Sequence, residues 1–272
     1  GPATIPELGR LLAANATGER RPVLPGGGRT SLGFGFPADP ASVEVATSRL
    51  DRVVDYPARD MTVTVEAGCR MSAIQEALKM EGQRLPVDVP LAHRATIGGA
   101  VASDAGGPRR FGFGTLRDYV IGIRCATVDG RLFKAGGRVV KNVAGYDLCK
   151  LMVGSGGSLA FVAEVTLKLK PLPTSSAMGW ACFDSGDTVS DLLGDLSTSR
   201  ARPVAIELLG PKAARQLTAE SRQTLPVGPL LLGVAVEGNP VEVEWQVDVL
   251  DRELRAGGAC LLYTSPRPRD RG

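Results

Sequence analysis

Residues 96–114, with the sequence TIGGAVASDAGGPRRFGFG, are the stretch that constrains the fold most strongly. They hold six glycines in nineteen positions, and Arg109 and Arg110 stand near the end. Glycine lets backbone amides approach a ligand closely and adopt a positive φ without steric cost. A flexible linker is the alternative, but linkers rarely keep an apolar pattern such as the one across residues 97–101. We therefore interpret the stretch as one wall of a ligand site.

A second glycine cluster lies in residues 22–35, PVLPGGGRTSLGFG. A short strand at residues 22–24 leads into three glycines, followed by Arg29, Thr30 and Ser31. Consecutive free N–H groups form a concavity that binds anions. The pattern is not GxxxxGK[ST], and it is not a GxGxxG that opens a helix, which argues against a P-loop and a Rossmann fingerprint.

The length of 272 residues suits one large domain or two modest ones. The hydrophobic fraction of 43% is that of an ordinary globular chain. The formal net charge is +3 and the basic residues are spread along the chain, which argues against nucleic acid as a partner. The sequence shows no apolar run of about 18 residues and no signal-peptide pattern, so we expect a cytoplasmic protein.

Cysteine and histidine usage limits the chemistry. The five cysteines are scattered without a CxxC pair, which is typical of reduced thiols. Among them, Cys125 and Cys149 are expected to be buried small hydrophobes. His93 is the only histidine, so the chain has no multi-histidine metal site, and we predict an exposed or hydrogen-bonded loop position for it.

Apolar periodicity predicts an α+β fold. The expected helices before residue 171 are residues 5–16, 71–80 and 146–152, the last with Asp147 near its N-terminus. The expected strands are residues 22–24, 42–47, 50–56, 61–67, 85–89, 118–128, 131–134 and 159–169. The strands 42–47 and 50–56 are expected to join at Ser48-Arg49, and Asp129-Gly130 is expected to form a hairpin turn.

A domain boundary is expected at residues 171–176, PLPTSS. Beyond it, strands at residues 178–183, 203–208 and 230–236 alternate with helices at residues 188–196, 211–218 and 240–254. This succession predicts a small layered α/β cap over residues 177–260, which we expect to be incomplete. A strand could begin at residues 259–263, but residues 261–272 (LLYTSPRPRDRG) resemble translated adapter sequence and are expected to be non-native.

Three segments taken together resemble a known family. PGGGRT (25–30), the run from Ala95 to Gly122 and the run from Val139 to Pro173 are similar to the FAD-binding unit of the vanillyl-alcohol-oxidase (PCMH-type) superfamily. Residues 137–173, which include KNVAGYDL, look most like the FAD-binding E subunits of bacterial glycolate oxidase. The resemblance implies a two-lobed FAD-binding domain over residues 1–173, with lobes of about residues 1–56 and 57–173.

The resemblance also implies a cofactor site. The residues that it assigns to FAD are Pro25, Gly26, Gly27, Gly28, Arg29, Thr30, Pro90, Thr96, Ile97, Gly98, Gly99, Ser103, Gly106, Gly107, Gly114, Gly156, Gly157, Ser158, Leu159 and Val162. Lys141, Asn142, Tyr146 and Asp147 are expected to support the flavin site. The first loop has no histidine for a covalent link, so we expect non-covalent FAD. Arg109 and Arg110 either neutralise phosphates or a partner's carboxylates, or are solvated surface charges.

The implied function is that of an FAD-binding subunit of a glycolate oxidase (dehydrogenase) complex, which oxidises glycolate to glyoxylate. The implied partners are a second flavoprotein subunit and an iron–sulfur subunit, with any inner-membrane association made through them. No catalytic residue is identified and no metal is expected. The alternatives are a self-sufficient FAD oxidoreductase for another small 2-hydroxy acid or alcohol, and a non-catalytic assembly subunit.

Overall fold

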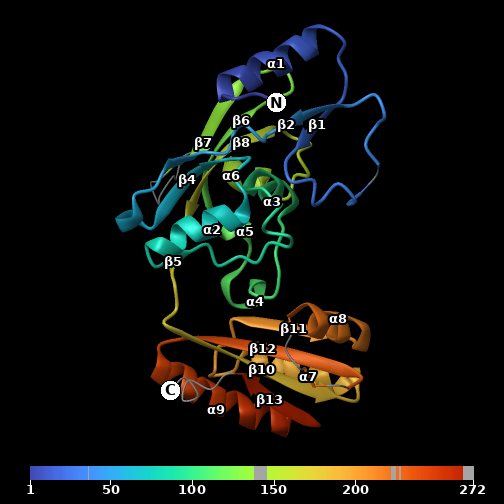
Figure 1. Ribbon diagram of the computed structural model, residues 1–272, viewed down its shortest axis with the longest axis vertical. Helices are drawn as coiled ribbons and strands as arrows, with labels where there is room; N and C mark the ends of the chain where they lie inside the picture. Colours follow the sequence, from blue (N-terminus) through green and yellow to red (C-terminus); the bar gives the residue numbers. More distant parts are fainter. Residues whose placement is uncertain (36, 138–145, 222–224, 227, 266–272) are drawn as a thin grey trace. The chain divides into compact units, whose positions relative to one another are not determined.

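The structure, a computed structural model, describes residues 1–35, 37–137, 146–221, 225–226 and 228–265 (Figure 1). It divides into two compact units. The first unit contains Gly1–Gly107 and Gly114–Leu172, and the second contains Pro108–Phe113 and Pro173–Gly272. Each unit is described by itself below.

A five-stranded sheet forms the centre of the first unit (Figure 1). Neighbouring strands are antiparallel, in the order β3 (Val53–Asp55), β4 (Thr62–Glu66), β8 (Phe161–Lys168), β6 (Val120–Ala126) and β7 (Leu132–Gly136). The β6–β7 hairpin turns at Gly130, where φ is +86°, so the predicted hairpin is confirmed. The α+β class predicted from the sequence is also confirmed.

Helix α1 (Ile5–Thr17) is amphipathic and buries its apolar face in the first unit. Leu8 and Leu12 are fully buried against Val45, Leu50 and Phe161 in one hydrophobic cluster. The Thr4 hydroxyl accepts a hydrogen bond from the Glu7 N–H and so caps the first turn. Nearby, β1 (Val23–Gly26) and β2 (Val43–Ala46) form a separate two-stranded parallel sheet.

The remaining elements of the first unit are short, apart from one helix. They are α2 (Met71–Met80), α3 (Ile97–Ser103), α5 (Leu116–Tyr119), α6 (Leu148–Met152), the 3₁₀ turn η1 (Ala58–Asp60) and the strand pair β5 (Gln83–Arg84) and β9 (Lys170–Pro171). The bounds of α2 equal those predicted, and Asp147 caps α6 by accepting from the Lys150 N–H at 3.2 Å.

The second unit is a four-stranded antiparallel sheet with helices. Its strand order is β11 (Ala205–Leu209), β12 (Leu230–Gly238), β10 (Ser175–Phe183) and β13 (Leu261–Ser265). Its helices are α4 (Arg110–Phe113), α7 (Gly186–Ser197), α8 (Pro211–Ser221) and α9 (Pro240–Ala256). Side chains of α7 and α9 share a buried core with β10 and β12, around Phe183, Leu192 and Leu250.

Several expectations are corrected by the structure. The segments 42–47 and 50–56 do not pair with each other, because β2 joins β1 and β3 joins β4. The strand expected at residues 85–89 is wrong, since Pro86 and Pro90 lack the N–H that a ladder needs, and only Gln83–Arg84 pair. The β-like run from residue 118 begins with a helical turn, α5.

Two further expectations concern other parts of the chain. The glycine-rich stretch 96–114, for which no helix was expected, contains α3 and α4. At the other end, residues 261–265 of the presumed non-native tail form β13 on β10, while residues 266–272 lie outside the described residues. Among the described residues, no helix has the length and apolar character needed to cross a membrane.

Candidate cofactor site

A cavity of about 310 Å³ lies in the first unit, where three segments distant in sequence meet. Its volume is at the lower end of the range of about 300–1,000 Å³ for small-molecule sites. The segments are the loop after β1, helix α3 with its N-cap, and the loop that leads into β8. The lining residues are Leu24, Pro25, Gly27, Gly28, Arg29, Thr30, Ser31, Leu32, Phe34, Thr47, Thr96, Gly98, Gly99, Ala102, Ser103, Gly154, Gly156, Gly157, Ala160, Phe161 and Val162.

Most of the site residues expected from the sequence come together here. Those that line the cavity are Pro25, Gly27, Gly28, Arg29, Thr30, Thr96, Gly98, Gly99, Ser103, Gly156, Gly157 and Val162. Those that do not line it are Gly26, Pro90, Ile97, Gly106, Gly107, Gly114, Ser158 and Leu159.

The residues away from the cavity have structural surroundings of their own. Ile97 is fully buried in the core. A Cβ at Gly107 would lie 2.8 Å from the Asp88 Cβ, and Gly114 has φ +79° beside the Asp118 carboxylate. The neighbours of these three positions are therefore protein atoms outside the cavity lining.

Two glycines in the cavity wall allow the first loop to pack closely against the start of α3. A Cβ on Gly27 would overlap the Thr96 hydroxyl, and one on Gly28 would overlap the Arg94 carbonyl oxygen. The loop after β1 can therefore lie against the start of α3 only with glycine at these positions. The glycine cradle expected from the sequence has this packing as its physical reason.

The N–H groups that are free to bind an anion lie in the first loop (residues 28–30) and not at the start of α3. The N–H groups of Ile97 and Gly98 donate to Cys69 and Ala67 carbonyl oxygens, each at 2.9 Å, so they are already used. The Gly99 N–H faces the Thr96 hydroxyl at 3.4 Å. Within the described part of the chain, no protein acceptor is found for the N–H groups of residues 28–30. Successive unpaired amides of this kind suit a phosphate.

Arg29 offers the cavity its backbone N–H, while its guanidinium is paired with Glu44. Its Nε donates to Glu44 Oε1 at 3.0 Å, and a second guanidinium nitrogen pairs with the other oxygen of Glu44. The side-chain hydrogen bond and the charge of Glu44 raise the pKa of Arg29. Its φ is +55°, a left-handed conformation that turns the loop. The ion pair thus holds the loop that carries the free amides.

The apolar mouth of the cavity is not predictable from the sequence. Leu32 and Phe34 line it and are 47% and 79% exposed, which is unusual for large apolar side chains. The signal was present as SLGFG directly after PGGGRT, but its exposure is visible only in three dimensions. Apolar side chains at the mouth fit a ligand with a flat ring system.

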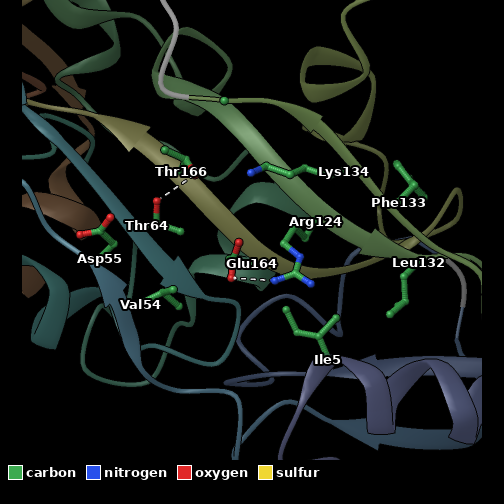
Figure 2. A pocket seen from close by; sticks show the side chains of 11 residues that line it. Ile5, Val54, Asp55, Thr64, Arg124, Leu132, Phe133, Lys134, Glu164 and Thr166 are labelled. Atoms are coloured by element: carbon green, nitrogen blue, oxygen red, sulfur yellow. Dashed lines mark hydrogen bonds and ion pairs between the residues drawn. The ribbon is translucent and has the colours of Figure 1, made fainter.

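A larger cavity of about 660 Å³ lies on one face of the five-stranded sheet (Figure 2). Figure 2 shows Arg124 facing Glu164, with 3.6 Å between Nη1 and Oε2, and Thr64 bonded to Thr166 at 3.0 Å. Ile5 of α1 closes one side. Its polar groups are largely paired with one another, so this surface offers a ligand fewer open partners than the glycine-lined cavity.

A ladder of charges crosses this sheet face. Glu66 and Glu164 are direct partners in the β4–β8 register, and Arg124 is the partner of Glu164 in β6–β8. Arg52 binds the Glu66 carboxylate through Nη2 at 2.8 Å and Nε at 3.1 Å. Burial tends to raise the pKa of Glu66, but hydrogen bonds and the charge of Arg52 outweigh it and lower that pKa below its usual value. The two arginines thus offset the repulsion of two adjacent carboxylates.

The other candidate residues take structural positions. His93 is exposed in a turn, as predicted, and Tyr146 is 97% exposed. Lys141 and Asn142 lie outside the described residues. Burial raises the pKa of Cys125 to about 12 and that of Cys149 to about 11, which confirms them as buried apolar thiols.

An α+β unit with a glycine-lined cavity, unpaired amides and exposed apolar side chains at that cavity suits the class of proteins that bind a phosphate-bearing ligand with a flat ring. Residues 2–136 match the family described as FAD binding domain. The chain therefore carries an FAD-binding domain of the PCMH type, and its residues fit that cofactor through the glycine cradle and the unpaired amides.

Relatives with assigned names are similar over much of this chain. "Glycolate oxidase subunit GlcD" of Bacillus subtilis is 26% identical over 97% of this chain and 56% of its own length. "Glycolate oxidase subunit GlcE" of Escherichia coli is 37% identical over 59% of this chain and 46% of its own length. "D-2-hydroxyglutarate dehydrogenase" of Xanthomonas citri is 33% identical over 74% of this chain and 42% of its own length. The chain spans about half the length of these relatives.

Solved structures share the fold. An alkyldihydroxyacetonephosphate synthase has a TM-score of 0.78 at 19% identity, covering 98% of this chain and 53% of that chain. A p-cresol methylhydroxylase with substrate bound has a TM-score of 0.72 at 14% identity, covering 97% of this chain and 57% of that chain. At these identities the likeness establishes the fold alone.

Proposed function

We propose that this chain binds FAD non-covalently in the 310 Å³ cavity and is the FAD-binding part of an oxidoreductase acting on a small 2-hydroxy acid. The main support for this proposal is one cavity. The two glycine-rich segments and the start of β8 meet around it, and unpaired backbone amides lie in its wall. Glycolate is the first candidate substrate, because a glycolate oxidase subunit is 37% identical over 162 residues.

The first loop would hold the pyrophosphate of FAD. The amides of residues 28–30 and the hydroxyls of Thr30 and Ser31 supply donors there. Each hydrogen bond to a charged phosphate contributes about 1.5–3 kcal/mol. Leu32 and Phe34 would then cover an apolar ring of the cofactor and lose their exposure.

Substrate oxidation needs further groups. A flavin beside the substrate would supply the hydride acceptor for oxidation of a 2-hydroxy acid. The reaction also needs a base for the hydroxyl proton and a cation for the carboxylate. His93 is exposed in a turn, and the described residues contain no group of three or more His, Cys, Asp or Glu side chains that could hold a metal. We therefore assign the substrate site to a partner flavoprotein subunit of a complex that also holds an iron–sulfur subunit.

Anaerobic visible spectra of the FAD-loaded chain test this function. We expect glycolate, D-lactate and D-2-hydroxyglutarate to leave the flavin oxidised when the chain is alone. We expect one of them to bleach it when the partner subunits are added. Rapid bleaching by the chain alone would instead support a self-sufficient oxidoreductase, and a chain that stays colourless after reconstitution would support an assembly subunit.

A further inference from the structure

The first loop contains one non-glycine residue with a left-handed backbone. Arg29 has φ +55°, whereas neither Gly28 nor Thr30 has a positive φ. An L side chain in this conformation is strained, because its Cβ crowds the following carbonyl oxygen. A reversal of hand of this kind turns successive N–H groups toward one concavity. The conformation of Arg29 therefore sets where the N–H groups of residues 28–30 point, for which the described residues offer no protein acceptor.

A bidentate ion pair holds the Arg29 side chain. Glu44 on β2 accepts from Arg29 Nε through Oε1 at 3.0 Å, and its Oε2 pairs with Nη2. Exposed ion pairs contribute little to stability unless their geometry is favourable, and a bidentate contact between arginine and a carboxylate is the favourable case. The Glu44 side chain is only 30% exposed, so one partner of the pair is largely fixed by its surroundings.

Gly26 makes room for this carboxylate. In the parallel pairing of β1 and β2, Leu24 lies opposite Glu44, so Glu44 and Gly26 share one face of the small sheet. A Cβ on Gly26 would overlap the Glu44 carboxylate. The resemblance assigns Gly26 to the cofactor, but this residue does not line the cavity. The absence of a side chain there lets Glu44 reach past the end of β1 to the loop.

We propose that Glu44 is a positioning residue for the phosphates of the cofactor. It fixes Arg29 in the left-handed conformation and so directs the N–H groups of residues 28–30 into the cavity. It also occupies the guanidinium, so that backbone amides bind the phosphates and the charge of Arg29 does not. This inference rests on the proposed binding of FAD in that cavity, and all of its contacts lie within the first unit.

Glycine at position 29 separates the conformation of this residue from its charge, because glycine adopts a positive φ without steric cost. We expect Glu44→Gln to lower FAD affinity about fivefold, as the strain at Arg29 is no longer offset. Adding Arg29→Gly to Glu44→Gln is expected to recover most of that affinity, whereas adding Arg29→Ala recovers none. Glu19→Gln is the matched control, since it removes an exposed ion pair with Arg21 outside the cavity lining and is expected to bind FAD like wild type.

The single variants at position 29 decide the question even where Glu44→Gln fails to fold. They leave Glu44 in place, and weaker FAD binding by Arg29→Ala than by Arg29→Gly supports the proposal. An equal loss of affinity in these two variants would overturn it, because the guanidinium itself would then bind the phosphates. A gain of affinity in Glu44→Gln would overturn it for the same reason.

Limited trypsin digestion of the FAD-free chain tests the ion pair without the cofactor. Cleavage after an arginine requires a segment that can leave its folded conformation, so its rate reports on the opening of the first loop. We expect Glu44→Gln to accelerate cleavage after Arg29 about fivefold relative to cleavage after Arg131, whose pair with Asp129 is unchanged. An unchanged ratio would overturn this inference alone. Accelerated cleavage in a chain whose wild type binds no FAD would instead overturn the proposed function.

Discussion

Gly28 is the residue at which a single methyl group would alter the cofactor cavity. Because its Cβ would overlap the Arg94 carbonyl oxygen, Gly28→Ala must push the first loop away from its place. We expect FAD affinity to fall about tenfold or more, equivalent to about 1.4 kcal/mol. Gly33→Ala in the same loop has open space around it and is expected to bind FAD like wild type. Titration of flavin fluorescence with both variants checks this, and equal affinities would contradict the assignment of the loop.

Glu66 gives the fold a predictable response to acid. Its pKa is lower in the folded protein than its usual value, so its pairing with Arg52 stabilises the fold above that value. This contribution is lost as the pH falls through the lowered pKa. We expect Glu66→Gln to unfold about 1.5–3 kcal/mol more easily near neutral pH and to show a smaller loss of stability in acid. Urea unfolding from about pH 7 to about pH 3 measures both, and parallel pH profiles would refute the role of this pair.

At the scale of one element, α3 depends on its cap. The Thr96 hydroxyl accepts from the Gly99 N–H and also packs over Gly27. We expect Thr96→Ala to lower stability by about 0.5–2 kcal/mol and to weaken FAD binding, because the wall of the cavity loosens. Thr96→Ser keeps the acceptor and should behave like wild type. Thermal unfolding followed by FAD titration distinguishes the two variants, and a fully stable Thr96→Ala would contradict the cap.

The elements also show what the sequence can predict. Helix α2 has a regular apolar period, so its bounds are found correctly. Helix α3 was missed because glycine has low helix propensity, and tertiary packing overrides it. A Cβ on Gly98 would lie 2.7 Å from the Ala67 Cβ, so glycine is what lets α3 pack at the end of β4. Spacing alone cannot tell such a packing glycine from one that lines the cavity. The assignment of Gly107 and Gly114 to the cofactor comes from the family resemblance and stays a prediction, although neither lines the cavity.

At the scale of the whole molecule, the thiols report on folding. Cys69, Cys125, Cys149 and Cys182 are buried, and burial raises the pKa of each, whereas Cys260 is exposed. The Cys260 thiol donates to the Asp184 carboxylate, which raises the pKa of Cys260 as well, so its exposure and not a low pKa sets it apart. We therefore expect one thiol to react in the folded chain, slowly and faster at higher pH, and the others only after unfolding. Quantitative alkylation measures this, with Cys260→Ser as the variant that removes the early reaction. Early modification of Cys125 or Cys149 would contradict the buried core of the first unit.

The central claim is that this chain binds FAD in the cavity where the two glycine-rich segments meet the start of β8. The most direct test is titration of the purified chain with FAD, followed by denaturation and separation of small molecules from polypeptide. We predict saturable binding at one FAD per chain, affinity reduced by Gly28→Ala but not by Gly33→Ala, and full release of the flavin on denaturation. No binding, binding indifferent to Gly28→Ala, or flavin that stays on the denatured polypeptide would contradict the account.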